Sequence, residues 1–219
     1  MSNKKNKIDL AIDRKFIKPL DFGCKYNIGI IKDSDASHYQ TVSLLRESYN
    51  TLEESFKLIN SGSLVASNVL IRSALEYLMM AVSIQFNEKI YNEFIDLNSN
   101  REESEPLDII NEFKKDFLEM KTPLLEDINH ARSFTNMHDF YTCLCNFSHA
   151  SVVVCTFDKI NDSNEITVLK QIFISNYYYL KMLLFYVLIY FTKDKDHYLL
   201  PQNIGCTFLI YSFNIFVTF

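Results

Sequence analysis

Residues 62–87 read GSLVASNVLIRSALEYLMMAVSIQFN, and this stretch decides the fold. Apolar residues lie on nearly every side of a helix drawn through it, which is typical of a helix at the centre of a bundle. Gly62 is suited to end a preceding helix in the left-handed conformation. We therefore predict a central helix from about Ser63 to Leu97.

A second long helix is predicted just before it, from about Ser37 to Asn60. Its apolar residues recur at steps of three and four, which draws one apolar stripe down a helix. They are Val42, Leu45, Tyr49, Leu52, Phe56 and Ile59. Asn60, Ser61 and Gly62 are predicted to end this helix.

The remaining patterns are also mostly helical. We predict a short amphipathic helix at Leu107–Met120, a broken helical region from Pro123 to Ser151, and a last helix at about Glu165–Thr192. Tyr26–Ile31 and Val152–Val154 are predicted as short extended pieces. The fold class is then all-α, with one bundle of about five to six helices.

Three regions follow from this pattern. Residues 1–36 show no sustained period and are predicted to be an irregular N-terminal arm. Residues 37–192 form the helical bundle, and residues 193–219 form an apolar C-terminal segment. At 219 residues the chain suffices for one well-buried core.

Composition narrows the class of protein. The net charge is −5, whereas a protein that coats nucleic acid is usually basic, so broad phosphate binding is not expected. A local basic site remains compatible with this charge. The five cysteines are odd in number, and no apolar export segment follows the basic start MSNKKNK. We expect a cytoplasmic protein with reduced thiols.

No metal or cofactor site is expected. Cys143 and Cys145 form C-x-C rather than C-x-x-C, and no second cysteine or histidine pair stands at zinc spacing. Gly-rich phosphate loops and common hydrolase motifs do not occur.

Two apolar stretches need comparison with a membrane span. Tyr177–Phe191 has 15 residues and one charge, Lys181, and Cys206–Phe219 has 14 residues and no charge. A helical span needs about 20 apolar residues, so we favour buried helices. Membrane contact through the C-terminal third stays open as an alternative.

Arg72 and Glu76 are the only charged residues between Gly62 and Asn87. They stand four apart and so share one face of the helix, and Asn68 extends that polar line by one turn. Charges on a central helix are costly unless they are paired. One interpretation is a structural pair that fixes how helices dock. The other is a polar pocket in which Arg72 receives a phosphate or carboxylate and Glu76 orients it.

Two further segments contain candidate catalytic histidines. Residues 141–151 read YTCLCNFSHAS, and His149 continues the face of Tyr141 and Cys145. A histidine in this position is most simply a satisfied helix-end residue, but histidine also serves as an acid or base near neutral pH. Arg132 and His138 are separated by five residues. They lie too far apart on one straight helix to aim at one point, so a helix break or a dimer interface would be needed.

The layout resembles the HEPN-like helical families. The RSALE element at 72–76, the Y-x-x-L-C-x-x-S-H element at 141–149 and the R-x5-H spacing of Arg132 and His138 carry the resemblance, which covers residues 40–192. Similar helical proteins occur in bacteria beside defence and abortive-infection genes. The resemblance implies a compact, often dimeric bundle.

Active members of these families are metal-independent ribonucleases that leave a cyclic phosphate. In them the histidine moves protons at the ribose 2′-hydroxyl and the 5′-oxygen, and the arginine stabilises charge on the scissile phosphate. By motif, Arg132 and His138 take these roles here. The resemblance thus predicts a defence or toxin-type protein with an RNA substrate, a homodimeric assembly and an antitoxin or other protein partner.

Two alternatives remain open. The first is a non-catalytic helical module that senses a ligand or holds a protein partner, with Arg72 and Glu76 purely structural. The second is a membrane-associated effector anchored by its C-terminal third. In the enzymatic interpretation Arg132, His138 and His149 are the catalytic candidates, and Asn68, Arg72 and Glu76 are the substrate-binding candidates.

Overall fold

A computed structural model describes residues 18–99, 137–148 and 163–192 of the chain. These residues form six α-helices and one 3-10 turn, and within these ranges there is no β-strand, which confirms the predicted all-α class. The helices are α2 (Lys18–Ile30), α3 (Tyr39–Ser61), α4 (Leu64–Phe86), α5 (Glu88–Ser99), α8 (Met137–Ser148) and α10 (Ser163–Thr192). The 3-10 turn η2 spans Asp33–Asp35. Predictions that concern residues 1–17, 100–136, 149–162 and 193–219 lie outside the described residues.

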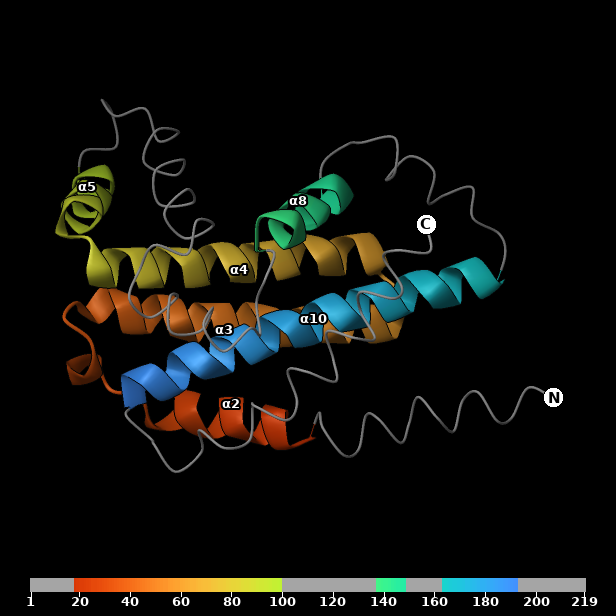
Figure 1. The fold of residues 1–219 in the computed structure, drawn as a ribbon, viewed down its shortest axis with the longest axis horizontal. Helices are drawn as coiled ribbons and strands as arrows, with labels where there is room; N and C mark the ends of the chain where they lie inside the picture. The colour runs from red at the N-terminus through yellow and green to blue at the C-terminus, as the bar shows by residue number, and fades with distance from the viewer. Residues whose placement is uncertain (1–17, 100–136, 149–162, 193–219) are drawn as a thin grey trace.

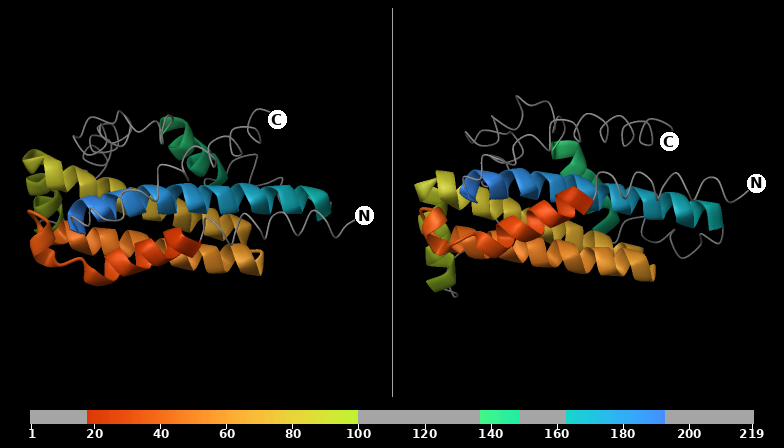
Figure 2. Two further views of the ribbon diagram at one scale, coloured as in Figure 1. Left: turned by 60° about the horizontal axis from the view of Figure 1, so that its bottom comes forward. Right: turned by 90° about the horizontal axis from the view of Figure 1, so that it is seen from below.

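Three long helices, α3, α4 and α10, lie side by side and form the body of the bundle (Figure 1). Figure 2 shows α2 along one side of this body and α5 turned away at one end. The helix α8 crosses over α4 and α10. The core is continuous through these elements, and Leu52, Leu75, Leu78 and Leu183 are among its fully buried members.

The helices α3 and α4 form an antiparallel hairpin. Gly62 ends α3 with φ 85°, and its N–H bonds to Ile59 O, which confirms the left-handed stop. The predicted apolar stripe of α3 is also confirmed, because Val42, Leu45, Tyr49, Leu52 and Ile59 are buried and Phe56 packs on the core.

Small residues let α3 and α4 approach closely. Ser48 Oγ donates to Ala74 O at 2.7 Å, so these residues lie level in the antiparallel pair. In this antiparallel pair, a step of seven residues forward on α3 corresponds to a step of seven residues backward on α4. Counted from Ser48 and Ala74, Ser55 therefore lies level with Ser67, and Thr41 lies level with Ala81. All six residues are fully buried. Two matching heptad lines of small side chains therefore form the contact.

The predicted central helix at Ser63–Leu97 is wrong in one respect, since it is two helices. Asn87 leaves the helical conformation with φ −134° and ψ 101°. Its Oδ1 accepts bonds from the N–H groups of Lys89 and Ile90, at 3.1 and 3.3 Å, which starts α5. The break was not predicted, because a single polar residue in an apolar stretch does not indicate that a helix ends there.

The predicted irregular arm is wrong for residues 18–30, which form α2, and the predicted extended piece at Tyr26–Ile31 falls largely within this helix. Pro19 lies in the first turn, where a helix tolerates proline. The buried face of α2 consists of Leu20, Gly23, Cys24 and Asn27. Because three of these four residues are small or polar, the apolar period that reveals other helices is missing here.

Two of the described helices are long and apolar enough to cross a membrane by length and composition alone. They are Leu64–Phe86 and the Leu169–Thr192 part of α10. The core helix of a soluble protein passes the same test. In this bundle 50% of the most apolar 18-residue stretch of the first helix is buried, and 78% of the corresponding stretch of the second is buried.

Candidate functional site

The Arg72–Glu76 pair lies on the face of α4 that meets α8. Arg72 Nε lies 3.1 Å from Glu76 Oε1, and the two side chains are 22% and 30% exposed. The spacing of four residues places them one helical turn apart, as predicted. The pair is therefore partly shielded from water while still within reach of it.

Tyr141 on α8 completes this pair. Its hydroxyl donates to Glu76 Oε1 at 3.0 Å, which is the same oxygen that receives Arg72. The Arg72 guanidinium carbon also lies 6.0 Å from the centroid of the Tyr141 ring, within the range of a cation–π contact. Glu76 thus joins a cation of its own helix to a hydroxyl of the neighbouring helix.

Asn68 continues the contact one turn earlier on α4. It is fully buried, and its Nδ2 donates to the backbone carbonyl of Leu144 at 2.9 Å. The contacts Glu76–Tyr141 and Asn68–Leu144 run in opposite chain directions, so α8 lies antiparallel to α4. We call Asn68, Arg72, Glu76 and Tyr141 the α4–α8 cluster.

Aromatic contacts hold the other face of α8 on α10. The rings of Phe140 and Tyr179 are 4.6 Å apart, and those of Phe147 and Phe173 are 5.3 Å apart. Because α8 packs on both α4 and α10, the position of the α4–α8 cluster is set by three helices.

Electrostatics favour the charged form of Arg72. Burial acts to lower its pKa, but the charges of Glu76, Tyr141 and Cys145 and the Glu76 hydrogen bond outweigh this, so the pKa is raised. Burial, followed by the negative charge of Glu76, raises the pKa of Tyr141. At neutral pH the α4–α8 cluster therefore contains a guanidinium, a carboxylate and a neutral phenol.

Of the three catalytic candidates, Arg132, His138 and His149, only His138 lies among the described residues. Arg132 and His149 lie outside the described residues. His138 belongs to α8, three residues before Tyr141, and its backbone alone is described. Its place in the chain puts it one turn from the α4–α8 cluster. Among the described residues, no three His, Cys, Asp or Glu side chains gather where they could hold a metal ion.

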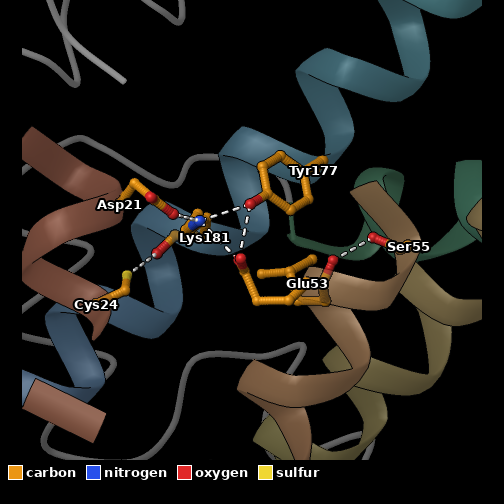
Figure 3. Close-up of polar contacts among 7 residues, drawn as sticks. Asp21, Cys24, Glu53, Ser55, Tyr177 and Lys181 are labelled. Carbon is orange, nitrogen blue, oxygen red and sulfur yellow. Dashed lines mark hydrogen bonds and ion pairs between the residues drawn. The ribbon is translucent and has the colours of Figure 1, made fainter. Parts of the chain in front are cut away.

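A second polar cluster was not predicted. Lys181 on α10 is only 1% exposed, and its Nζ donates to Asp21 on α2, to Glu53 on α3 at 2.7 Å and to Tyr177 Oη at 2.5 Å (Figure 3). Tyr177 in turn donates to Glu53 Oε1 at 2.9 Å. We call Asp21, Glu53, Tyr177 and Lys181 the lysine cluster. It ties three helices together.

Cys24 lies beside the lysine cluster. Its thiol donates to the carbonyl of Lys181 at 3.4 Å and is fully buried. Burial is the main cause that raises its pKa, and Lys181 only partly opposes this. Burial, then the charge of Glu53, likewise raises the pKa of Tyr177. Both groups are therefore neutral, and the charges of the lysine cluster belong to Lys181, Asp21 and Glu53.

Sequence offered one signal for the lysine cluster. Lys181 is the single charge in the apolar stretch Tyr177–Phe191. Such a charge predicts a buried partner, because an unpaired ammonium in a core is costly. The partners are 128 and 160 residues away in the chain, and no local period identifies them.

We predict that Asn68→Ala loosens α8 in particular. The loss of a buried hydrogen bond should lower the free energy of unfolding by about 1 kcal/mol. Amide hydrogen exchange in α8 should accelerate more than exchange in α3. Asn60→Ala, at the exposed end of α3, is the control. Equal exchange rates in α8 with and without the Asn68 amide would contradict the docking role.

Stability should fall at alkaline pH. Burial raises the pKa of Cys143 to about 11, and burial also raises the pKa of Cys24, Tyr177 and Tyr179. In an unfolded chain thiols and phenols ionise near pH 8.5 and 10, so above pH 8.5 the folded state holds more protons. The stabilisation is complete below that pH and is lost as the pH rises.

Urea unfolding at pH 7.5, 9 and 10.5 measures this dependence. The free energy of unfolding should drop by at least about 2 kcal/mol across the range. Cys143→Ser should remove part of the slope, because it removes one of the thiols. A stability that stays level up to pH 10.5 would show that these groups are not shielded as described.

Comparison with known proteins gives no match for this chain among family models, among curated proteins or among solved structures.

Proposed function

We propose that this protein is a HEPN-like bacterial defence or toxin-type protein that cleaves RNA without a metal ion. One observation carries the proposal. The polar line of α4 and the Tyr141–Leu144 part of segment 141–151 meet in the α4–α8 cluster, through contacts between residues 65 and 76 positions apart in the chain. Ionisable groups that converge on a partly buried site are candidates for chemistry.

The roles follow from side-chain chemistry. A guanidinium recognises a phosphate through parallel N–H donors, and Glu76 and Tyr141 fix the position of Arg72 for this role. In the proposal His138 or His149 removes the proton of the ribose 2′-hydroxyl, and a protonated histidine donates to the departing 5′-oxygen. Arg132 and Arg72 stabilise the charge on the phosphate. The 2′-oxygen attacks phosphorus and the 5′-oxygen leaves, which yields a 2′,3′-cyclic phosphate.

The direct test is to incubate purified protein with total cellular RNA in the presence of a chelator. The proposal predicts fragments that end in a 2′,3′-cyclic phosphate. His138→Ala should lower the rate by about 100-fold or more if the R-x5-H pair is the site, because that is the usual contribution of general acid–base catalysis. If His149→Ala has this effect instead, the site consists of Arg72, Glu76 and His149.

A matched histidine variant controls for unspecific effects. His38→Ala removes a histidine that is far along the chain from α8 and stacks on Tyr91, with the ring centroids 3.6 Å apart. This variant should leave the cleavage rate within about twofold of the wild type. If the protein produces no cyclic-phosphate ends under any condition, the ribonuclease proposal fails.

A non-catalytic module is the second candidate function, and one observation favours it. Glu76 neutralises Arg72 and accepts a bond from Tyr141, so the pair already serves to dock α8. An intact fold, no RNA cleavage and unchanged growth on overexpression would support this function. Co-purification would then reveal a homodimer or an antitoxin-type partner.

The proposal places the protein in the cytoplasm. A membrane-associated effector anchored by its C-terminal third is the remaining alternative, and the apolar helix α10 in that third supports it. Cell fractionation with an alkaline wash separates these cases. Recovery in the soluble fraction supports the cytoplasmic assignment, whereas retention in the membrane pellet supports the anchored effector.

A further inference from the structure

The helix α2 presents its larger apolar side chains outward. Phe22, Tyr26 and Ile30 are 68%, 44% and 40% exposed. Its buried face contains small or polar residues apart from Leu20, namely Gly23, Cys24 and Asn27. This helix therefore buries little apolar surface against the bundle, and polar contacts have to contribute much of its attachment.

Three polar contacts join α2 to α10. Asp21 pairs with Lys181, the Cys24 thiol bonds to the Lys181 carbonyl at 3.4 Å, and Asn27 Oδ1 accepts from Thr192 at 2.7 Å. The order of these contacts shows that α2 runs in the same direction as α10. At Gly23 the helices touch so closely that a Cβ atom would lie 2.5 Å from Phe185 Cε2. The Phe185 ring thus occupies the space that a side chain at position 23 would need.

The two carboxylates of the lysine cluster are not equivalent. Glu53 belongs to α3 and also receives the Tyr177 hydroxyl, so it stays with the three-helix body. Asp21 belongs to α2 and its side chain is 46% exposed. If α2 moves away together with Asp21, Lys181 still contacts the Glu53 carboxylate and the Tyr177 hydroxyl. The body of α3, α4 and α10 can therefore remain paired without α2.

The C-terminal end of α2 is anchored separately. Arg46 on α3 donates to the Ile31 carbonyl at 2.6 Å and pairs with Asp33 in η2 at 3.2 Å. A helix that is fixed at one end and held at the other by an ion pair whose carboxylate is 46% exposed has the construction of a hinged strap.

We propose that α2 is a strap that opens independently of the α3–α4–α10 body, and that the Asp21–Lys181 pair is the latch that keeps it closed. Opening pivots near Ile31–Asp35 and uncovers Cys24 and Lys181, which are both buried in the closed form. Local opening of this kind is a normal low-energy motion of weakly packed elements.

Hydrogen exchange of the full-length native protein, read by peptide mass spectrometry, tests the strap. In the wild type, amides of Leu20–Ile30 should exchange at least about tenfold faster than buried amides of α3 and α4. Low urea should accelerate exchange in α3 and α4 more than in α2, because unfolding of the body exposes more surface than opening of α2. Asp21→Asn should accelerate exchange in α2 by about a further tenfold and leave α3 and α4 within about twofold. Alkylation of Cys24 by iodoacetamide should accelerate in parallel.

Glu54→Gln is the matched control, because it also neutralises a carboxylate but removes only an exposed pair with Lys57 on α3. It should leave α2 exchange within about twofold of the wild type. The strap is overturned if α2 and the body exchange at one common rate, or if Asp21→Asn leaves α2 unchanged. If Asp21→Asn does not fold, the wild-type comparison and Thr192→Val, which removes the Asn27 contact, decide the question in the same way.

Discussion

Replacing Lys181 by methionine is expected to lower the free energy of unfolding by about 2–3 kcal/mol. Methionine keeps an unbranched apolar stem, so most packing around α10 remains. The loss comes from Asp21 and Glu53, which then face each other without the ammonium that both contact. A fully buried pair would lose more, but these carboxylates are 46% and 31% exposed, and water compensates in part.

Two comparisons make this expectation specific. Lys57→Met removes an exposed pair with Glu54 and should change stability by less than about 0.5 kcal/mol. Adding Asp21→Asn to Lys181→Met should recover part of the lost stability, because one of the two opposed carboxylates disappears. Urea unfolding measures all of these variants. If Lys181→Met is as stable as the wild type, the lysine cluster does not stabilise the fold.

Replacing Ala74 by leucine is expected to destabilise the bundle by about 3 kcal/mol. Ala74 is fully buried and its carbonyl lies 2.7 Å from Ser48 Oγ, so three added carbon atoms have no space between α3 and α4. The helices would have to move apart, and this would also loosen their packing at the levels of Ser55 and Thr41, which are both buried.

Ala66→Leu is the matched control for this overpacking. It makes the same substitution on the same helix at an exposed position. Its effect should stay within about 0.5 kcal/mol of the wild type. Thermal or urea unfolding distinguishes the two positions. A small effect at both positions would contradict the close approach of the helix hairpin.

Sequence predicted those parts of the fold in which large apolar side chains mark the buried face. The stripe of α3 and the all-round apolar α4 are of this kind, and the stop at Gly62 has its own local cause. The helix α2 was not predicted because three of its four buried residues are glycine, cysteine and asparagine. The break at Asn87 was not predicted, because a single capping residue does not alter the apolar periodicity of the surrounding helices.

The candidate site was likewise predictable from the sequence only in part. Arg72, Glu76 and Asn68 could be placed on one face of a helix, because a spacing of four residues is a local property. That this face meets Tyr141, and that Lys181 meets Asp21 and Glu53, depends on how helices pack. Such contacts join residues 65 to 160 positions apart, where sequence order contains no information about distance.

A double-mutant cycle between Glu76 and Tyr141 tests the α4–α8 cluster most directly. The variants are Glu76→Gln, Tyr141→Phe and the two combined, each with the free energy of unfolding measured in urea. Because the Tyr141 hydroxyl donates to the Glu76 carboxylate, we predict a coupling energy of about 1 kcal/mol. Strictly additive losses, within about 0.3 kcal/mol, would mean that α4 and α8 do not meet through these residues.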